Sequence, residues 1–162
     1  MTRVLGVDVG ERRVGLALSD ASATLATPLR VMPAGTTPAD SARRLAALLR
    51  AAGPDDPLRE VGHLVIGLPR RLNGEDTGQT PAVRTFAGVL EGETALPVHL
   101  QDERLTSREA EARLAVNDRD WRSRKRRLDA AAAAVILQDY LDARTAEASR
   151  AAGTPASPGR ER

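Results

Sequence analysis

The sequence predicts a single α/β domain in which helices flank a mixed sheet of five strands. Three strand patterns follow one another at the start of the chain, and two more are each reached through a helical pattern. Short turns join antiparallel strands, whereas helical crossovers join parallel strands, so both pairings are expected in one sheet. The chain has 162 residues, the size of one ordinary domain with a sizeable core.

The first three strands are predicted over residues 3–9, 13–19 and about 25–32, where apolar residues are bounded by turn residues. Gly10 supplies the first turn, and the polar cluster at 19–22 supplies the second. Connections this short predict an antiparallel meander. We expect the first strand to lie centrally in the sheet.

The rest of the domain alternates helices with strands. The spacing of leucine and alanine predicts a helix over 40–52, which Gly53-Pro54 ends. The apolar run at 64–68 is typical of a strand covered on both faces, and Thr80-Pro81 predicts a capped helix start. The remaining elements are a strand at 98–101, a helix from Thr106 to about Val116, a basic segment at 122–127 and a last helix at 128–143.

Composition limits the class of protein. The chain has no cysteine, which excludes a disulfide framework and a cysteine-bound zinc site. The sequence shows neither a secretory signal nor a membrane-spanning stretch, so we expect a soluble cytoplasmic protein without a membrane partner. Small residues, proline and arginine predominate after residue 143. The domain is therefore predicted to span 1–143, and 144–162 to form a disordered tail.

Acidic residues follow the strands at one edge of the predicted sheet. Asp8 ends the first strand, and Asp102 and Glu103 follow the strand at 98–101. Asp129 lies in the opening turn of the last helix. Parallel strands bring their carboxyl ends to one edge, so these groups can converge. Burying a dry carboxylate is costly, so Asp8 is expected to pair with a metal ion or a basic side chain; an ordinary turn residue is the alternative.

Convergent carboxylates suit hard divalent cations, because Mg²⁺ takes oxygen ligands and retains waters that can be exchanged. Two ions about 3.5–4 Å apart activate water and stabilise the leaving oxygen in phosphodiester cleavage. The pattern therefore predicts a site for Mg²⁺ or Mn²⁺, with two ions. The two histidines, His63 and His99, have no second ligand or base at a suitable spacing, which favours structural roles.

Two basic segments are candidates for phosphate binding. Arg70 and Arg71 begin a loop that contains Asn73-Gly74, where backbone N–H groups and cations can hold nucleic acid; a solvated turn is the alternative. The second segment has five cations in six residues just before Asp129, which favours electrostatic contact with nucleic acid. Trp121 beside it can stack on a base or pack in the core. The five cations are Arg122, Arg124, Lys125, Arg126 and Arg127.

Four blocks of residues stand out along the chain. They are Gly6-Val7-Asp8-Val9-Gly10 through Ala17, Val65-Ile66-Gly67-Leu68-Pro69 through Gly74, Asp102-Glu103-Arg104-Leu105-Thr106-Ser107 with Glu109 and Ala110, and Leu128-Asp129 through Leu141. In this order and at these spacings they resemble the YqgF/RuvX family of bacterial RNase H-like proteins, over almost everything from Val4 to Leu141. Two departures are Ser107, where the family usually has a second threonine, and Glu75, where a small hydroxyl residue often occurs. Neither removes an acid.

The resemblance implies an RNase H-like fold and a nuclease that trims the 5′ end of the 16S ribosomal RNA precursor. It also implies that Asp8, Glu103 and Asp129 are the catalytic, metal-binding acids. Adjacent strand residues point to opposite faces, so we favour Glu103 over Asp102 as the metal ligand. Asp102 then pairs with Arg104 or lies in a turn. For Asp129 the alternative is a favourable charge near a helix N-terminus.

The implied partners are structured RNA, as in a ribosomal subunit precursor, or branched DNA. The superfamily also contains Holliday-junction resolvases, which cut two strands symmetrically and so work as two-fold dimers; both a monomer and a homodimer stay open. A non-catalytic nucleic-acid-binding module is a third reading. Actin-like kinases and ATPases share the first hairpin, but they need two such lobes and this chain has one.

Overall fold

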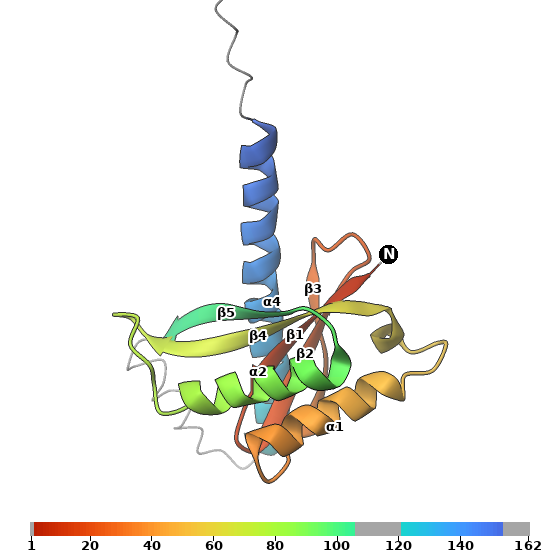
Figure 1. Ribbon diagram of the computed structural model, residues 1–162, viewed down its shortest axis with the longest axis vertical. Helices are drawn as coiled ribbons and strands as arrows, with labels where there is room; N and C mark the ends of the chain where they lie inside the picture. Colours follow the sequence, from red (N-terminus) through yellow and green to blue (C-terminus); the bar gives the residue numbers. More distant parts are fainter. Residues whose placement is uncertain (1, 106–120, 154–162) are drawn as a thin grey trace, which may run out of the picture.

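The computed structural model describes residues 2–105 and 121–153, with the side chains of residues 105 and 121–129 outside the description. In this part of the chain, five strands form one sheet between two layers of helix (Figure 1). Helices α1 and α2 cover one face, and α4 crosses the other. The elements in chain order are β1 (Arg3–Val9), β2 (Arg13–Ser19), β3 (Ala26–Pro33), α1 (Pro38–Arg50), the 3-10 turn η1 (Pro57–Glu60), β4 (Val61–Arg71), α2 (Thr80–Thr94), β5 (Val98–Leu105) and α4 (Trp121–Ala152).

The strand order of the sheet is β3-β2-β1-β4-β5, with β1 in the centre. β1 pairs antiparallel with β2 and parallel with β4, and β4 pairs parallel with β5. The bounds of β1 and β2 agree with the predicted residues 3–9 and 13–19. The predicted mixed sheet with a central first strand is therefore confirmed.

Large side chains fill the layer between the sheet and the helices α1 and α2. Leu5 and Val7 of β1 and Ile66 of β4 are buried in one cluster with Leu45 of α1 and Phe86 of α2. Fully burying a side chain of this kind contributes about 1.5–3 kcal/mol. This layer therefore supplies the larger share of the hydrophobic stabilisation in the described chain.

Small residues line the other face of the sheet, where α4 crosses it. A Cβ added at Gly6 would lie 2.7 Å from the Cβ of Leu137 and 2.9 Å from the carbonyl oxygen of Ala133. A Cβ added at Gly67 would lie 2.5 Å from Cδ1 of Ile136. The two glycines thus let α4 approach the sheet closely, which sets the position of the helix on β1 and β4.

The last two strands are longer than predicted. β4 begins at Val61 and ends at Arg71 instead of covering 64–68, and β5 continues to Leu105 instead of ending at 101. The two strands pair with each other as far as Arg71↔Leu105. Cross-strand pairing therefore extends the ladder through charged residues, beyond the apolar run that marks the strand in the sequence.

The start of α2 differs from the predicted cap. Thr80 is the first residue of the helix and is buried, while Gln79 holds the N-cap position without a side-chain hydrogen bond. The hydroxyl of Thr80 accepts a hydrogen bond from the N–H of Thr77 (2.8 Å) and donates one to the carbonyl of Pro69 (2.6 Å). Thr80 therefore ties the helix start to the end of β4 and does not cap the helix.

The last helix starts earlier and ends later than predicted. α4 begins at Trp121, so the basic residues 122–127 lie within it and do not separate two helices. Arginine, lysine and alanine are good helix formers, and no glycine or proline interrupts the stretch to Ala152. For the same reason, residues 144–152 are helical where a disordered tail was predicted. The predicted helix at 106–116, like residues 154–162, lies outside the described residues.

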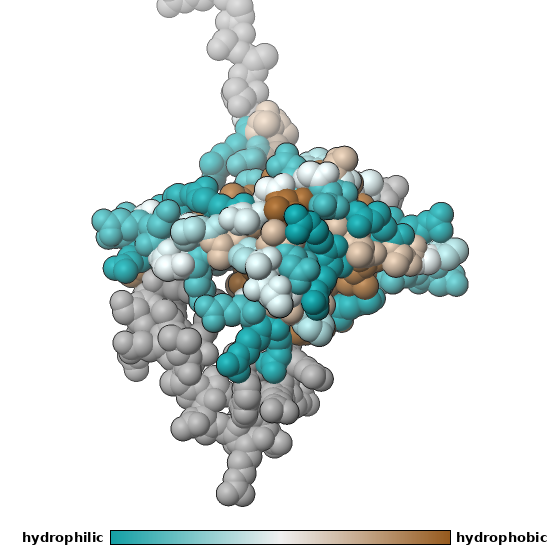
Figure 2. Space-filling view, turned by 60° about the horizontal axis from the view of Figure 1, so that its bottom comes forward, coloured by the Kyte–Doolittle hydropathy of each residue, from teal (hydrophilic) through white to brown (hydrophobic). Residues whose placement is uncertain are grey.

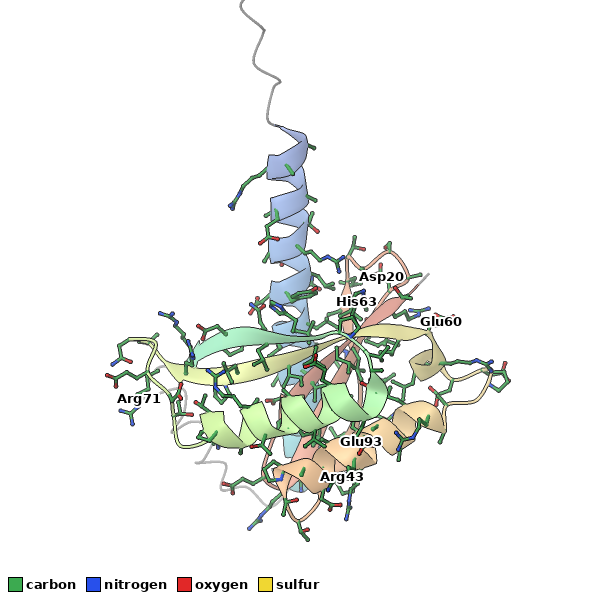
Figure 3. All side chains as sticks on the ribbon, viewed as in Figure 1. Asp20, Arg43, Glu60, His63, Arg71 and Glu93 are labelled. Atoms are coloured by element: carbon green, nitrogen blue, oxygen red, sulfur yellow. The ribbon has the colours of Figure 1, made fainter. Side chains whose placement is uncertain are left out.

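Charged side chains cover the outer surface of α1 and α2. Arg43 and Arg50 of α1 lie 3.8 and 3.6 Å from the carboxylate oxygens of Glu93 on α2, and Figure 3 shows Arg43 and Glu93 on neighbouring helices. Hydrophilic residues also prevail in Figure 2, which turns the lower side of the molecule forward. Among the described residues, no helix is both long and apolar enough to span a membrane.

Candidate active site

Asp8 is the second-to-last residue of β1 and lies on the sheet face that α4 covers. Side chains alternate along a strand, and Val4, which has the same parity, belongs to the apolar cluster that α4 forms with the sheet. The residue opposite Asp8 on β2 is Gly15, which has no side chain to fill the space beside the carboxylate. Asp8 is half-buried, and the sequence correctly placed it at the end of a buried strand.

The two adjacent acids of β5 lie on opposite faces of the sheet. His99 has the parity of Glu103, and its ring contacts that of Tyr140 on α4, with ring centroids 4.8 Å apart. Glu103 therefore lies on the α4 face together with Asp8, and its Oε1 atom is buried. Asp102 is exposed and points to the other face. The packing of His99 on Tyr140 also agrees with the structural role expected for this histidine.

Asp102 forms ion pairs on the face opposite the other acids. Its Oδ2 lies 3.4 Å from Nε of Arg104 and 3.9 Å from Nη1 of Arg70. All three side chains are partly exposed, so each pair contributes at most about 1 kcal/mol. Pairing with Arg104 was the expected alternative to metal binding, and because β5 continues past it, Asp102 is not a turn residue.

Asp129 lies in the third turn of α4, not in an opening turn as predicted. The helix dipole acts within the first turn, so it does not account for an acid at this depth. One turn later, the carbonyl of Ala133 lies against Gly6, two residues before Asp8 on β1. Ala130, which directly follows Asp129, lines a hollow together with Arg13, the residue that begins β2 after the turn that follows Asp8. The backbone of α4 therefore brings Asp129 to the end of the sheet at which Asp8 lies. The side chain of Asp129 lies outside the described residues.

Asp8 and Glu103 lie on the same face of the sheet, but β4 separates their strands. The register places Asp8 level with Gly67 on β4 and with Gln101 on β5, two residues before Glu103. Strands lie about 4.8 Å apart, so about 10 Å separates the two backbones across β4. Among the described side chains, which do not include Asp129, no three His, Asp or Glu groups lie close enough to hold a metal ion.

Arg13 is a residue of this edge that the sequence did not reveal. It begins β2 on the same face as Ala17, and its Nη1 atom is buried. With Ala130 it lines the hollow of about 780 Å³ that runs along β3. The other lining residues, 28–33, are mostly apolar, so the hollow itself does not suit a metal ion. The signal was a cation directly after the turn that follows Asp8, but the three charges at 11–13 resemble an ordinary solvated turn.

The predicted phosphate-binding residues lie in two places. Arg70 and Arg71 end β4, and Figure 3 shows Arg71 at the far end of that strand. Arg70 is half-buried and lies 3.8 Å from a carboxylate oxygen of Asp76, whereas Arg71 is exposed. The basic residues 122–127 occupy the first two turns of α4, and their side chains lie outside the described residues.

An antiparallel meander followed by parallel strands, with acids on one face at the ends of β1 and β5, defines the RNase H-like class of nucleases. The structure is similar to that of a Fowlpox virus resolvase solved in complex with Holliday junction DNA. The TM-score is 0.53 at 11% sequence identity, and the match covers 88% of this chain and 98% of the resolvase chain. This likeness concerns the fold alone.

Sequence comparisons identify the family within that class. Residues 2–143 match the RuvX family, described as Holliday junction resolvase. A relative from Anaeromyxobacter sp. (strain Fw109-5) is 44% identical over 144 residues, which cover 89% of this chain and 99% of the relative. Another, from Pelotomaculum thermopropionicum, is 39% identical over 140 residues, 86% of each chain. Both are named "Putative pre-16S rRNA nuclease". The chain belongs to the RuvX family of nucleases, as its four blocks of residues suggested.

Proposed function

We propose that this chain is a metal-dependent endonuclease that processes the 5′ end of pre-16S ribosomal RNA within a ribosomal subunit precursor in the cytoplasm. Membership of the RuvX family supports a nuclease, and the names of its relatives support the substrate. One structural observation carries the chemistry. Asp8 and Glu103 lie on the same face of the sheet, and α4 carries the backbone of Asp129 to the same edge.

The residues of this edge fit a divalent metal ion. Carboxylate oxygens are the ligands that Mg²⁺ and Mn²⁺ prefer, and the half-buried Asp8 and Glu103 provide them on one face. We assign the metal-binding role to these two acids and to Asp129. One ion or a pair of ions supplies, when bound, an activated water and stabilisation of the leaving oxygen.

Basic residues on α4 are assigned the task of holding the RNA. The basic residues 122–127 end two residues before Asp129 on the same helix, so all of them lie within two helical turns of that acid. Phosphate contacts bind nucleic acid strongly without reading its sequence. We therefore expect the shape of the folded RNA, and not its base sequence, to determine the cleavage position.

The proposal is tested by giving the purified protein two substrates at matched salt, a 5′-extended 16S precursor RNA and a four-way DNA junction, with Mg²⁺ or Mn²⁺. We expect metal-dependent cleavage of the RNA at its 5′ end. Asp8→Asn should abolish cleavage while the protein stays folded, because a charged ligand is lost without any loss of core packing. Asp139→Asn makes the same change at an exposed residue of α4 and should leave cleavage intact.

Other outcomes would contradict the proposal in distinct ways. Two symmetric cuts in the junction, with the RNA left intact, would identify a Holliday-junction resolvase, the activity in the family description, and would require a two-fold dimer. Binding without cleavage of either substrate would identify a non-catalytic module. Cleavage by Asp8→Asn at the wild-type rate would refute the assignment of the metal ligands.

The basic run is tested by binding across a salt series, in the Asp8→Asn background so that the RNA is not cut. Replacing Arg124, Lys125, Arg126 and Arg127 with glutamine keeps a good helix former at each position. Each lost phosphate contact should lower the slope of log affinity against log salt by about 0.7–0.9. Glutamine at Arg43, Arg44 and Arg50 of α1 is the control, and an unchanged slope in the α4 variant would refute the assignment.

A further inference from the structure

β4 and β5 extend beyond the rest of the sheet. β1 pairs with β4 only as far as Val7↔Ile66, whereas β4 and β5 stay paired as far as Arg71↔Leu105. We call the paired segments 68–71 and 102–105 the two-stranded extension. At about 3.3 Å per residue, Arg71 lies about 13 Å beyond Gly67, the residue level with Asp8. Figure 1 shows the extension at one side of the molecule, where the chain turns back toward α2.

Strand alternation separates the two adjacent arginines of the extension. Arg70 has the parity of the buried Leu68, and its guanidinium pairs with Asp76 and Asp102 on the face opposite Asp8 and Glu103. Arg71 has the parity of Gly67, which faces α4, and therefore shares the face of Asp8. Arg71 is exposed, and among the described residues no hydrogen bond or ion pair holds its guanidinium.

Arg104 holds the turn that follows Arg71. Its Nη1 donates a hydrogen bond to the carbonyl of Leu72 (3.2 Å), and its Nε lies 3.4 Å from Oδ2 of Asp102. The turn itself needs glycine at Gly74, whose φ is +85°, and a Cβ there would lie 3.5 Å from Nη2 of Arg104. The guanidinium of Arg104 therefore lies against the turn and links it to β5.

We propose that Arg71 binds a backbone phosphate of the substrate strand and that Asp102 and Arg104 are positioning residues that fix the turn carrying it. This inference rests on the proposed nuclease function and adds a second anchoring point for the same nucleic acid. Measured along β4 at about 3.3 Å per residue, the contacted phosphate lies about 13 Å from the residue level with Asp8. Arg70, which is engaged with Asp76 and Asp102, does not touch the substrate. The two adjacent acids of β5 thus have different roles: Glu103 binds the metal ion, and Asp102 helps to position the turn that carries Arg71.

The first test compares single variants of the full chain with the pre-16S RNA fragment as probe. Arg71→Gln should raise KM about tenfold, the size of one charge-assisted hydrogen bond, and leave kcat unchanged. In the Asp8→Asn background it should lower the salt slope of RNA binding by about 0.7–0.9. Arg70→Gln should change both quantities much less, and Arg84→Gln, an exposed arginine of α2, is the control.

The second test asks whether Arg104 acts through Arg71. Arg104→Gln should raise KM and speed amide exchange in residues 72–75, and Arg104→Lys should restore part of the affinity because lysine can still donate to the Leu72 carbonyl. In the Arg71→Gln background, Arg104→Gln should have no further effect on KM. Additive effects, or equal effects of Arg70→Gln and Arg71→Gln, would overturn the inference. The salt slope of RNA binding in the Asp8→Asn background and the amide exchange of residues 72–75 are measured without cleavage, so these two results distinguish failure of this inference from failure of the nuclease proposal.

Discussion

The two faces of the sheet are built from different residues. On the sheet, leucine and isoleucine dominate the face packed against α1 and α2, whereas glycine, alanine and valine line the face that receives Ile136, Leu137 and Leu141 of α4. Bulky apolar contacts stabilise a fold, while small residues let a helix backbone come close. Asp8 and Glu103 lie on the second face, so one sheet separates the residues that hold the fold from those proposed to perform the chemistry.

The largest expected effect tests the face of α1 and α2. Phe86 of α2 is fully buried, and Phe86→Ala should lower the free energy of unfolding by about 3–5 kcal/mol through lost burial and a cavity. The kcat of folded molecules should stay near the wild-type value, because the proposed acids lie on the other face. Urea unfolding and cleavage assays at low temperature measure the two quantities. A large fall in kcat while the variant is fully folded would break the separation.

The next effect tests the face of α4. Glu103→Gln should lower kcat at least about a hundredfold, or about 2.7 kcal/mol in the barrier, because it removes a metal-binding charge. Asp102→Asn makes the matched change on the opposite face and should leave kcat nearly unchanged. Thermal unfolding should show both variants folded. If Asp102→Asn proved the more damaging to kcat, the facing of the side chains would not decide the metal ligand.

A smaller effect tests the close approach of α4. Gly6→Ala should destabilise the fold by about 1–3 kcal/mol, because its Cβ would lie 2.7 Å from the Cβ of Leu137. It should also slow cleavage, since the helix that carries Asp129 must shift. Gly88→Ala in α2 meets nothing within 4 Å and should stabilise the fold by about 0.5–1 kcal/mol through helix propensity. Two changes of the same sign in thermal unfolding would contradict this account.

The smallest effect concerns a carboxylate far from Asp8 and Glu103, and Figure 3 shows Asp20 well apart from Arg71. The backbone N–H groups of Thr24 (2.8 Å) and Leu25 (3.1 Å), with the hydroxyls of Ser22 and Thr24, hold the pKa of Asp20 well below its usual range. A lowered folded-state pKa stabilises the fold above the unfolded pKa of about 4, and this contribution is lost as the pH falls below it.

Asp20→Asn should therefore be less stable than the wild type at neutral pH, and the difference should shrink as the solution is acidified below about pH 4. Cleavage of RNA should be unaffected, because this carboxylate serves a turn and binds no metal. Urea unfolding over a pH series measures the effect. A stability difference that did not change with pH would show that the hydrogen bonds, and not the charge, matter at this turn.

The sequence predicted the parts of the fold in which local pattern and tertiary context agree. β1 and β2 are apolar strands bounded by a glycine turn, so their limits could be read directly. The opposite facing of Asp102 and Glu103 also followed from strand alternation alone. In each case the periodicity of the backbone decides the outcome, and no distant contact is needed.

The rest depends on contacts that a local pattern does not reveal. The charges of the two-stranded extension are typical of a loop, but Arg70 pairs with Asp102 across the two strands, and Arg104 donates a hydrogen bond to the Leu72 carbonyl in the turn after β4. The early start of α4 follows from helix propensity in a basic run that was interpreted as a spacer. The burial of Arg13 could not be predicted from its neighbours in the sequence, because it depends on β3 and α4.

The last third of α4 affects how the protein unfolds on heating. Leu141 is buried, but every residue from 142 to 152 is exposed, and Figure 1 shows this stretch projecting away from the sheet. A helix this short would scarcely form alone in water, because its first turn is costly to nucleate. The packed turns up to Leu141 supply that nucleus, so the projecting turns only have to propagate it. They should therefore fray from Ala152 inward on warming, gradually and well before the sheet unfolds cooperatively.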